Sequence, residues 1–212
     1  MSSLSTELHA LLTQPGTAAL GPAARPGTLG QGELNRALDE LFRQHGQPAK
    51  VELIRSLLLL WHDHLDASHV IAQGIENPDG SLVHGIMHRR EPDYWNSKYW
   101  FRRVGQHACF TDLAKRVDPL LASDTKLAAQ LLPRRAWDAF AFVDAVEAAA
   151  SKPATDARHQ LLRQVQQAET EAALDYFLKP LAHNRRVCLT AFNFISRTAT
   201  VYSPSPPLGE RA

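Results

Sequence analysis

The fold is decided by residues 49–75, AKVELIRSLLLLWHDHLDASHVIAQGI, whose apolar side chains recur with the spacing of an α-helix. The buried face of that helix is predicted to consist of Val51, Ile54, Leu57, Leu58, Trp61 and Leu65. We expect one long central helix, on which the other helices of the domain pack.

Helical periodicity continues on both sides of this segment. Further helices are expected at residues 5–13, 33–44, 93–104, 111–122, 124–132, 134–150 and 155–180. The sequence Asn77-Pro78-Asp79-Gly80 forms a turn that fits either a connection between helices or a short β-hairpin near residues 74–86. The predicted class is therefore all-α, an irregular helical bundle around the long helix, with the hairpin left open.

The chain divides by composition into three parts. Residues 1–32 hold a short helix and then a run rich in glycine and proline, which predicts a flexible N-terminal segment. Residues 33–181 are the expected helical domain, which is long enough to bury a substantial core. Residues 182–212 end in a proline-rich run and are predicted to be a poorly structured tail.

The charge balance, the apolar runs and the cysteines limit which partners and which compartment can be expected for the protein. The 23 Lys and Arg against 22 Asp and Glu give a formal net charge of +1, so no strong field is available to gather nucleic acid. The apolar run 57–61 is far shorter than the roughly 20 residues that span a bilayer, and the N-terminus lacks a basic segment followed by an apolar one. Cys109 and Cys188 lie far apart and outside any C-x-x-C pair, which indicates a reducing compartment. We expect a cytoplasmic protein without a nucleic-acid or membrane partner, and leave homo-oligomer formation open.

Residues 61–107 concentrate the side chains suited to metal ligation and ring stacking, with six of the 10 histidines and three of the 4 tryptophans. One polar seam is expected on the long helix, formed by His62, Asp66, His69, Gln73 and Glu76. A second arm with the same spacing carries His84, His88 and Glu91. If the chain reverses at the turn between the arms, each polar residue of one seam meets a polar partner on the other.

This facing of two seams is what a shared metal or a buried hydrogen-bond network between helices requires. The candidate metal ligands are His62, Asp66, His69, His84 and His88, and the candidate acid and base groups are Asp66 and Glu91. Mixed histidine and carboxylate ligands suit zinc, iron or manganese, any of which can activate a bound water. A metal-free pocket and a purely structural network are alternatives, because histidines and carboxylates also satisfy one another.

The next segment, 89-RREPDYWNSKYWFRR-103, combines aromatic planes with cations. The predicted substrate contacts are Arg89, Arg90, Trp95 and Lys98, since guanidinium groups bind carboxylate and phosphate. The leading prediction is a metal-dependent enzyme, a hydrolase or lyase, that acts on a small polar or anionic molecule. The rival prediction is a non-catalytic protein that holds a sugar-like or nucleotide-like ligand on the Trp and Arg cluster at 89–103.

Two stretches, 61-WHDHLDASH-69 and 84-HGIMHRREPDYWNSKYWFRRVG-105, resemble a family of uncharacterised proteins that share this block. The resemblance covers about residues 55 to 110 and implies no activity. The sequence contains no G-x-S-x-G elbow, no Walker-type phosphate loop and no G-x-G-x-x-G. Serine hydrolase, P-loop NTPase and dinucleotide-binding functions therefore lack support.

Overall fold

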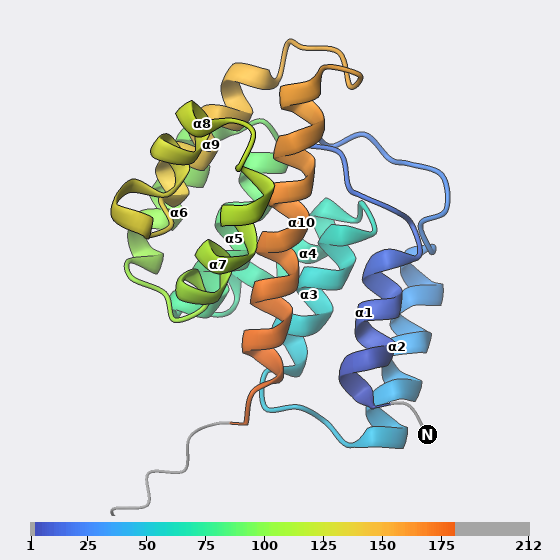
Figure 1. The fold of residues 1–212 in the computed structure, drawn as a ribbon. Helices are drawn as coiled ribbons and strands as arrows, with labels where there is room; N and C mark the ends of the chain where they lie inside the picture. The colour runs from blue at the N-terminus through green and yellow to red at the C-terminus, as the bar shows by residue number, and fades with distance from the viewer. Residues whose placement is uncertain (1–2, 181–212) are drawn as a thin grey trace, which may run out of the picture. The chain divides into compact units, whose positions relative to one another are not determined.

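The computed structural model describes residues 3–180, which form α-helices and one short 3-10 turn without any strand, so the all-α prediction is confirmed (Figure 1). The elements in chain order are α1 (Leu4–Thr13), α2 (Gln31–His45), α3 (Val51–Trp61), α4 (Leu65–Gln73), α5 (Pro78–Arg90), α6 (Tyr94–Val104), α7 (Phe110–Leu120), α8 (Thr125–Leu131), η1 (Pro133–Arg135), α9 (Ala139–Ala149) and α10 (Ala157–Leu178). No helix of this part of the chain is both long and apolar enough to cross a membrane.

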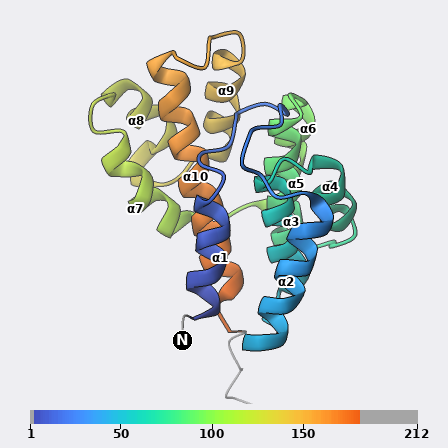
Figure 2. The ribbon, with the colours of Figure 1, turned by 90° about the vertical axis from the view of Figure 1, so that its right-hand side faces the viewer.

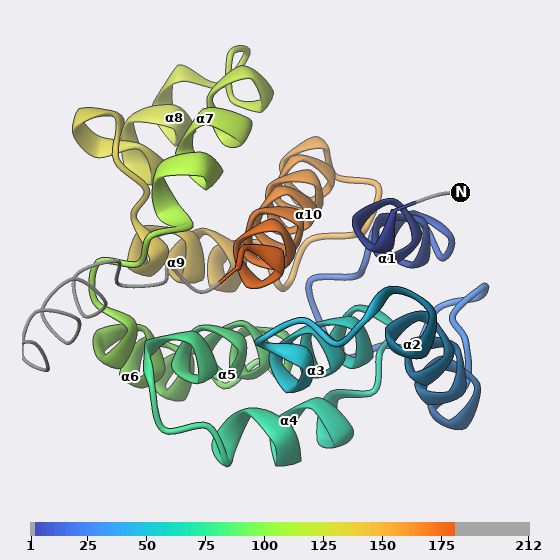
Figure 3. The ribbon, with the colours of Figure 1, turned by 90° about the horizontal axis from the view of Figure 1, so that it is seen from below.

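Helix α10 lies at the centre of the bundle and packs against α1, α3, α7 and α9. Figure 2 shows α7 and α8 on one side of α10 and α2 to α6 on the other. Seen from below, α2, α3, α5 and α6 form one layer, and α4 covers α3 and α5 from outside (Figure 3). Helix α5 is thus enclosed by α3, α4 and α6, whereas α4 has one side in solvent, where Val70 is exposed.

The long helix expected at residues 49–75 is interrupted, which corrects that prediction. Helices α3 and α4 are separated by residues 62–64, and Asp63 has a positive φ of 68°. The buried Asp63 carboxylate accepts hydrogen bonds from Arg25 at 3.1 Å and from Arg90 at 2.6 Å. Because a buried carboxylate is stable only when it is paired, these two ion pairs hold the break in place.

The Asn-Pro-Asp-Gly turn begins helix α5. The Asn77 side chain accepts a hydrogen bond from the Gly80 amide at 2.9 Å, and Pro78 occupies the first turn, both of which are typical of a helix N-terminus. A Cβ on Gly80 would lie 2.0 Å from the carbonyl oxygen of Ile75, so this tight connection requires glycine. The hairpin left open near residues 74–86 is therefore not formed.

The N-terminal segment, whose glycines and prolines predicted flexibility over residues 1–32, lies along the helical body where the structure describes it. Ala18 and Leu20 are buried, and Arg163 of α10 donates a hydrogen bond to the Ala18 carbonyl at 3.0 Å. This segment supplies backbone partners to helices far away in sequence. The tail predicted at residues 182–212 lies outside the described residues.

Candidate metal centre

Three histidines meet between two helices, His69 on α4 with His84 and His88 on α5. One ring nitrogen of each lies within 4.8 Å of the others, and the His69 ring centroid is 4.6 Å from that of His84 and 5.2 Å from that of His88. Within residues 3–180 this is the one group of three or more metal-ligating side chains as close as this. We call it the histidine cluster. Symmetry about the turn predicted His69 opposite His88, whereas the His69 ring lies nearer to His84 than to His88.

Burial of the cluster follows from the position of α5. Every residue of this helix from Gly80 to Arg90 is buried, because helices cover it on several sides. Helix α6 comes especially close at Gly85, where a Cβ would lie 3.1 Å from the Phe101 ring. The His84 and His88 imidazoles are consequently shielded from water, and only His69 is half-buried.

His84 is the side chain of the cluster whose polar atoms lack hydrogen-bond partners. Its ring lies between the Trp100 ring at 3.8 Å and the His88 ring at 4.8 Å, with both nearly parallel to it. Neither ring nitrogen has a hydrogen-bond partner within residues 3–180. Burial, together with the nearby His88 and His69, lowers the pKa of His84 to about 3, so the ring is neutral and carries a free lone pair. A buried polar group without a partner costs about 1–3 kcal/mol, so the feature calls for a ligand.

His88 is oriented by a carboxylate. Its Nδ1 donates a hydrogen bond to Glu91 Oε2 at 3.0 Å, which leaves the lone pair on Nε2. The Asn96 side-chain amide of α6 donates a hydrogen bond to that nitrogen at 3.1 Å. Burial lowers the pKa of His88, although the hydrogen bond to Glu91 opposes the shift. Histidine ligands of metals are commonly held by an outer carboxylate in this way.

The two candidate acid and base groups line one cavity, whose lining includes none of the three cluster histidines. Asp66 and Glu91 both face a cavity of about 400 Å³, which also includes His64. Glu91 reaches the cluster through His88, and Asp66 lies one turn before His69 on α4. Both carboxylates are outside the group of close ligand atoms, so the structure supplies three imidazoles where the sequence predicted a mixed set.

The structure does not bring His62 to the cluster. Its Nδ1 accepts a hydrogen bond from the Leu29 amide at 3.0 Å, and its Nε2 donates to the Leu11 carbonyl at 3.0 Å. Burial lowers the pKa of His62, so the ring is neutral and fully bonded. His62 therefore ties the N-terminal segment to the break between α3 and α4.

Three of the predicted substrate contacts form ion pairs away from the cluster. Arg89 is fully buried and pairs with Glu169 of α10 at 3.0 Å, and Arg90 is bound to Asp63 in the break between α3 and α4. Lys98 forms an ion pair with Asp144 of α9. The two arginines on which the expectation of an anionic substrate rested thus connect helices of the core.

Helix α6 contributes two contacts to the cluster that the sequence did not predict, the stacking of Trp100 on His84 and the amide of Asn96 at His88. A signal was present, because the two residues are four apart and share one face of α6. Trp95, a predicted substrate contact, lies one residue before Asn96 and is 73% exposed.

A second polar group surrounds His107. Its Nε2 donates to Asp79 at 2.8 Å, and its Nδ1 lies 2.9 Å from Cys109 Sγ. The order thiol, imidazole and carboxylate resembles that of a nucleophilic site. Burial raises the pKa of Cys109 to about 12, however, so the thiol stays protonated at neutral pH. Cys109 is therefore a buried, inert thiol.

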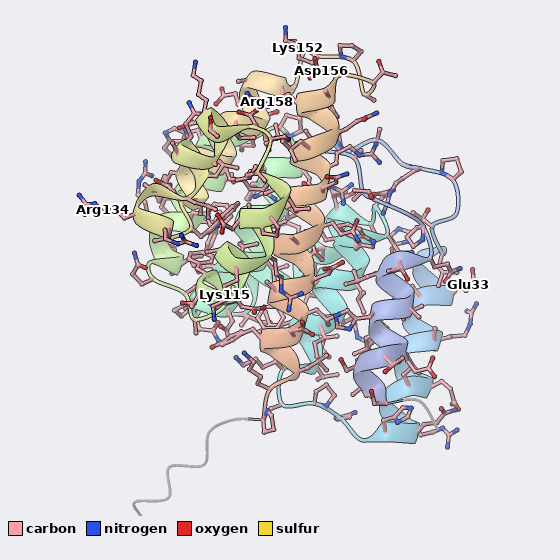
Figure 4. The ribbon with its side chains drawn as sticks, viewed as in Figure 1. Glu33, Lys115, Arg134, Lys152, Asp156 and Arg158 are labelled. Carbon is pink, nitrogen blue, oxygen red and sulfur yellow. The ribbon has the colours of Figure 1, made fainter. Side chains whose placement is uncertain are left out.

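A larger cavity lies elsewhere. It measures about 610 Å³ and is lined by α8, α9 and the start of α10, without any residue of α4, α5 or α6. Figure 4 shows three of its charged residues, Lys152, Asp156 and Arg158, together at the end of the bundle where α9 leads into α10. No histidine or cysteine lines it, so it is separate in position and chemistry from the histidine cluster.

Comparisons with known proteins provide no relative on which the cluster could be mapped. No protein-family model matches the sequence, and neither a curated protein nor a solved structure is significantly similar to the chain. The resemblance of residues 55 to 110 to an uncharacterised family stays a prediction. Function is therefore inferred from the geometry of the site itself.

Proposed function

We propose that the histidine cluster is the centre of a metal-dependent enzyme, a hydrolase or lyase, which binds a divalent ion and uses it to act on a small polar molecule. The proposal rests on one observation: His84 is a buried imidazole with two free nitrogens, in contact with two further imidazoles. A metal ion would give this ring the partner that it lacks.

The donor set favours zinc. Three protein nitrogens with one position left for water are typical of catalytic zinc sites. Iron and manganese, the other predicted ions, commonly take carboxylate ligands, whereas Glu91 is engaged by His88. Tetrahedral zinc needs nitrogens about 3.4 Å apart, and those of the cluster are up to 4.8 Å apart. His69 is half-buried on the partly solvent-exposed helix α4, so we propose that its side chain closes the gap.

The surrounding residues suggest how the centre works. Zinc lowers the pKa of a bound water to about 7, which supplies a nucleophile at neutral pH. Glu91 would keep His88 in the ligating tautomer. Asp66 lines the cavity shared with Glu91 and has no hydrogen bond or ion pair to another described residue. Asp66 would be the group that accepts the proton of that water.

The charges around the centre favour a polar substrate over a strongly anionic one. The cavity that Glu91 lines next to His88 presents the carboxylates of Asp66 and Glu91, while Arg89 and Arg90 are neutralised by buried partners. A divalent ion would balance the two carboxylates and leave the site close to neutral. This departs from the anionic substrate that the clustered arginines predicted.

Elemental analysis of protein prepared without an affinity tag tests the metal centre. We expect about one zinc ion per chain after incubation with zinc and removal of excess, and loss of that ion in both His69→Ala and His88→Ala. The matched control is His45→Ala, because His45 is an exposed histidine on α2 and its loss should leave the zinc content unchanged. Circular dichroism confirms that each variant keeps its helices. Zinc-free wild-type protein, or zinc retained in His88→Ala, would show the proposal to be wrong.

A further inference from the structure

Helix α6 exposes two large aromatic side chains close to the histidine cluster. Trp95 is 73% exposed and Tyr99 is 40% exposed. Their rings are nearly parallel, with 14° between the planes and 6.4 Å between the centroids. We call this pair the aromatic platform. Its apolar ring faces would gain free energy if a ligand covered them.

The platform is continuous with the cluster. Tyr99 meets Trp100 edge to face at 5.4 Å, and Trp100 stacks on His84 at 3.8 Å. Asn96, which follows Trp95, lies 3.1 Å from His88. Adjacent residues of α6 thus serve two surfaces, one exposed and one at the cluster.

The surroundings of the platform limit the size of what it can bind. Arg103 lies over the Trp100 ring at 5.3 Å, so the free ring faces are those of Trp95 and Tyr99. Lys98, between them in sequence, is held by Asp144 of α9. Two rings are far too small for a stable protein interface, which buries roughly 1,200–2,000 Å². They match the face of a single small ring.

We propose that the substrate of the metal centre carries a flat, uncharged ring that stacks on the aromatic platform while a polar group next to the ring reaches the ion. This inference rests on the proposed function, because it assigns the substrate class of the same site. It makes Trp95 and Tyr99 specificity-determining residues, which bind the ring without contacting the reacting atoms.

Two hydroxamates that differ only in their ring test the inference on zinc-loaded protein. Acetohydroxamate and benzohydroxamate present the same metal-binding group, and benzohydroxamate adds a phenyl ring. Calorimetry should show benzohydroxamate binding roughly 2- to 10-fold more tightly to the wild type, as expected for one aromatic stack. The preference should vanish in Trp95→Ala and persist in Trp95→Phe. Phe140→Ala, at another exposed aromatic residue, on α9, is the matched control and should keep the preference.

The outcomes separate the two proposals. Equal binding of both hydroxamates to the wild type, or a phenyl preference that survives Trp95→Ala, overturns the ring inference and leaves the metal centre intact. Failure of acetohydroxamate to bind the zinc-loaded protein overturns both. Because Trp95 is exposed, its replacement does not endanger folding, and circular dichroism checks this directly.

Discussion

His62 and His84 are two buried histidines of the same helical layer that differ in the hydrogen bonding of their ring nitrogens. His62 is 0% exposed and His84 is 2% exposed. Both nitrogens of His62 are bonded to backbone groups, whereas neither nitrogen of His84 has a partner among the described residues. Burial is therefore the same, and what differs is hydrogen bonding. His62 thus connects parts of the fold, whereas His84 has nitrogens available for a ligand.

The difference arises from what surrounds each ring. The N-terminal segment crosses His62 and brings it an amide from Leu29 and a carbonyl from Leu11. His84 contacts three side-chain rings, those of His69, His88 and Trp100. Rings fill space but offer no hydrogen bond to an imidazole nitrogen in this geometry. Within the cluster, His84 thus combines tight packing with an unused lone pair.

Replacing His84 by phenylalanine should give the largest effect. The His84→Phe variant keeps a ring between Trp100 and His88 but removes both nitrogens, so zinc affinity should fall by more than the roughly 100-fold that follows loss of an outer-shell partner. The metal-free variant should be at least as stable as the wild type, because two unsatisfied buried nitrogens are gone. Zinc titration against a competing chelator and urea unfolding measure the two quantities. Unchanged zinc affinity would remove His84 from the proposed ligand set.

The same substitution at His62 should show the opposite pattern. His62→Phe leaves the Leu29 amide and the Leu11 carbonyl without partners, which should lower the free energy of unfolding by about 2 kcal/mol or more. Zinc affinity should stay within about 2-fold of the wild type, since His62 contacts no member of the cluster. Urea unfolding of the metal-free protein measures the loss. If His62→Phe and His84→Phe behaved alike, the distinction between the two histidines would not hold.

The sequence predicted those parts of the site that depend on local spacing. His84 and His88 are one helical turn apart, and the turn after Asn77 brings His69 opposite them. The position of Glu91 one turn beyond His88 was visible for the same reason. Helical periodicity also gave the all-α class correctly. Each of these relations connects residues close together in the chain.

The relations that the sequence did not reveal connect distant residues. The helical pattern runs through residues 62–64 without a breaker, and the break depends on Arg25, which lies 38 residues before Asp63. Arg89 is buried because of Glu169, 80 residues further along the chain. Neither partner can be recognised from local spacing, because an arginine beside a histidine has the same pattern whether it binds a substrate or a distant helix.

Lowering the pH should have a smaller and graded effect on stability, which tests the same difference between His62 and His84. Burial is the main cause that lowers the pKa of His62; the hydrogen bond to Leu11 opposes it and Arg25 adds to it. The folded-state pKa therefore lies below the unfolded value of about 6.5. The stabilisation linked to neutral His62 is present in full above that value and is lost as pH falls toward the folded-state pKa, because a proton on Nδ1 would break the bond from Leu29.

Comparing metal-free wild type with His62→Gln isolates this contribution, since the other histidines are common to both proteins. The stability advantage of the wild type should shrink by on the order of 1 kcal/mol between about pH 7 and about pH 5.5. Urea unfolding at closely spaced pH values measures the trend, and His45→Gln, at an exposed position, should track the wild type throughout. An advantage that is constant over this range would mean that His62 is not held neutral by its two backbone partners, and hydrogen bonding would then not distinguish His62 from His84.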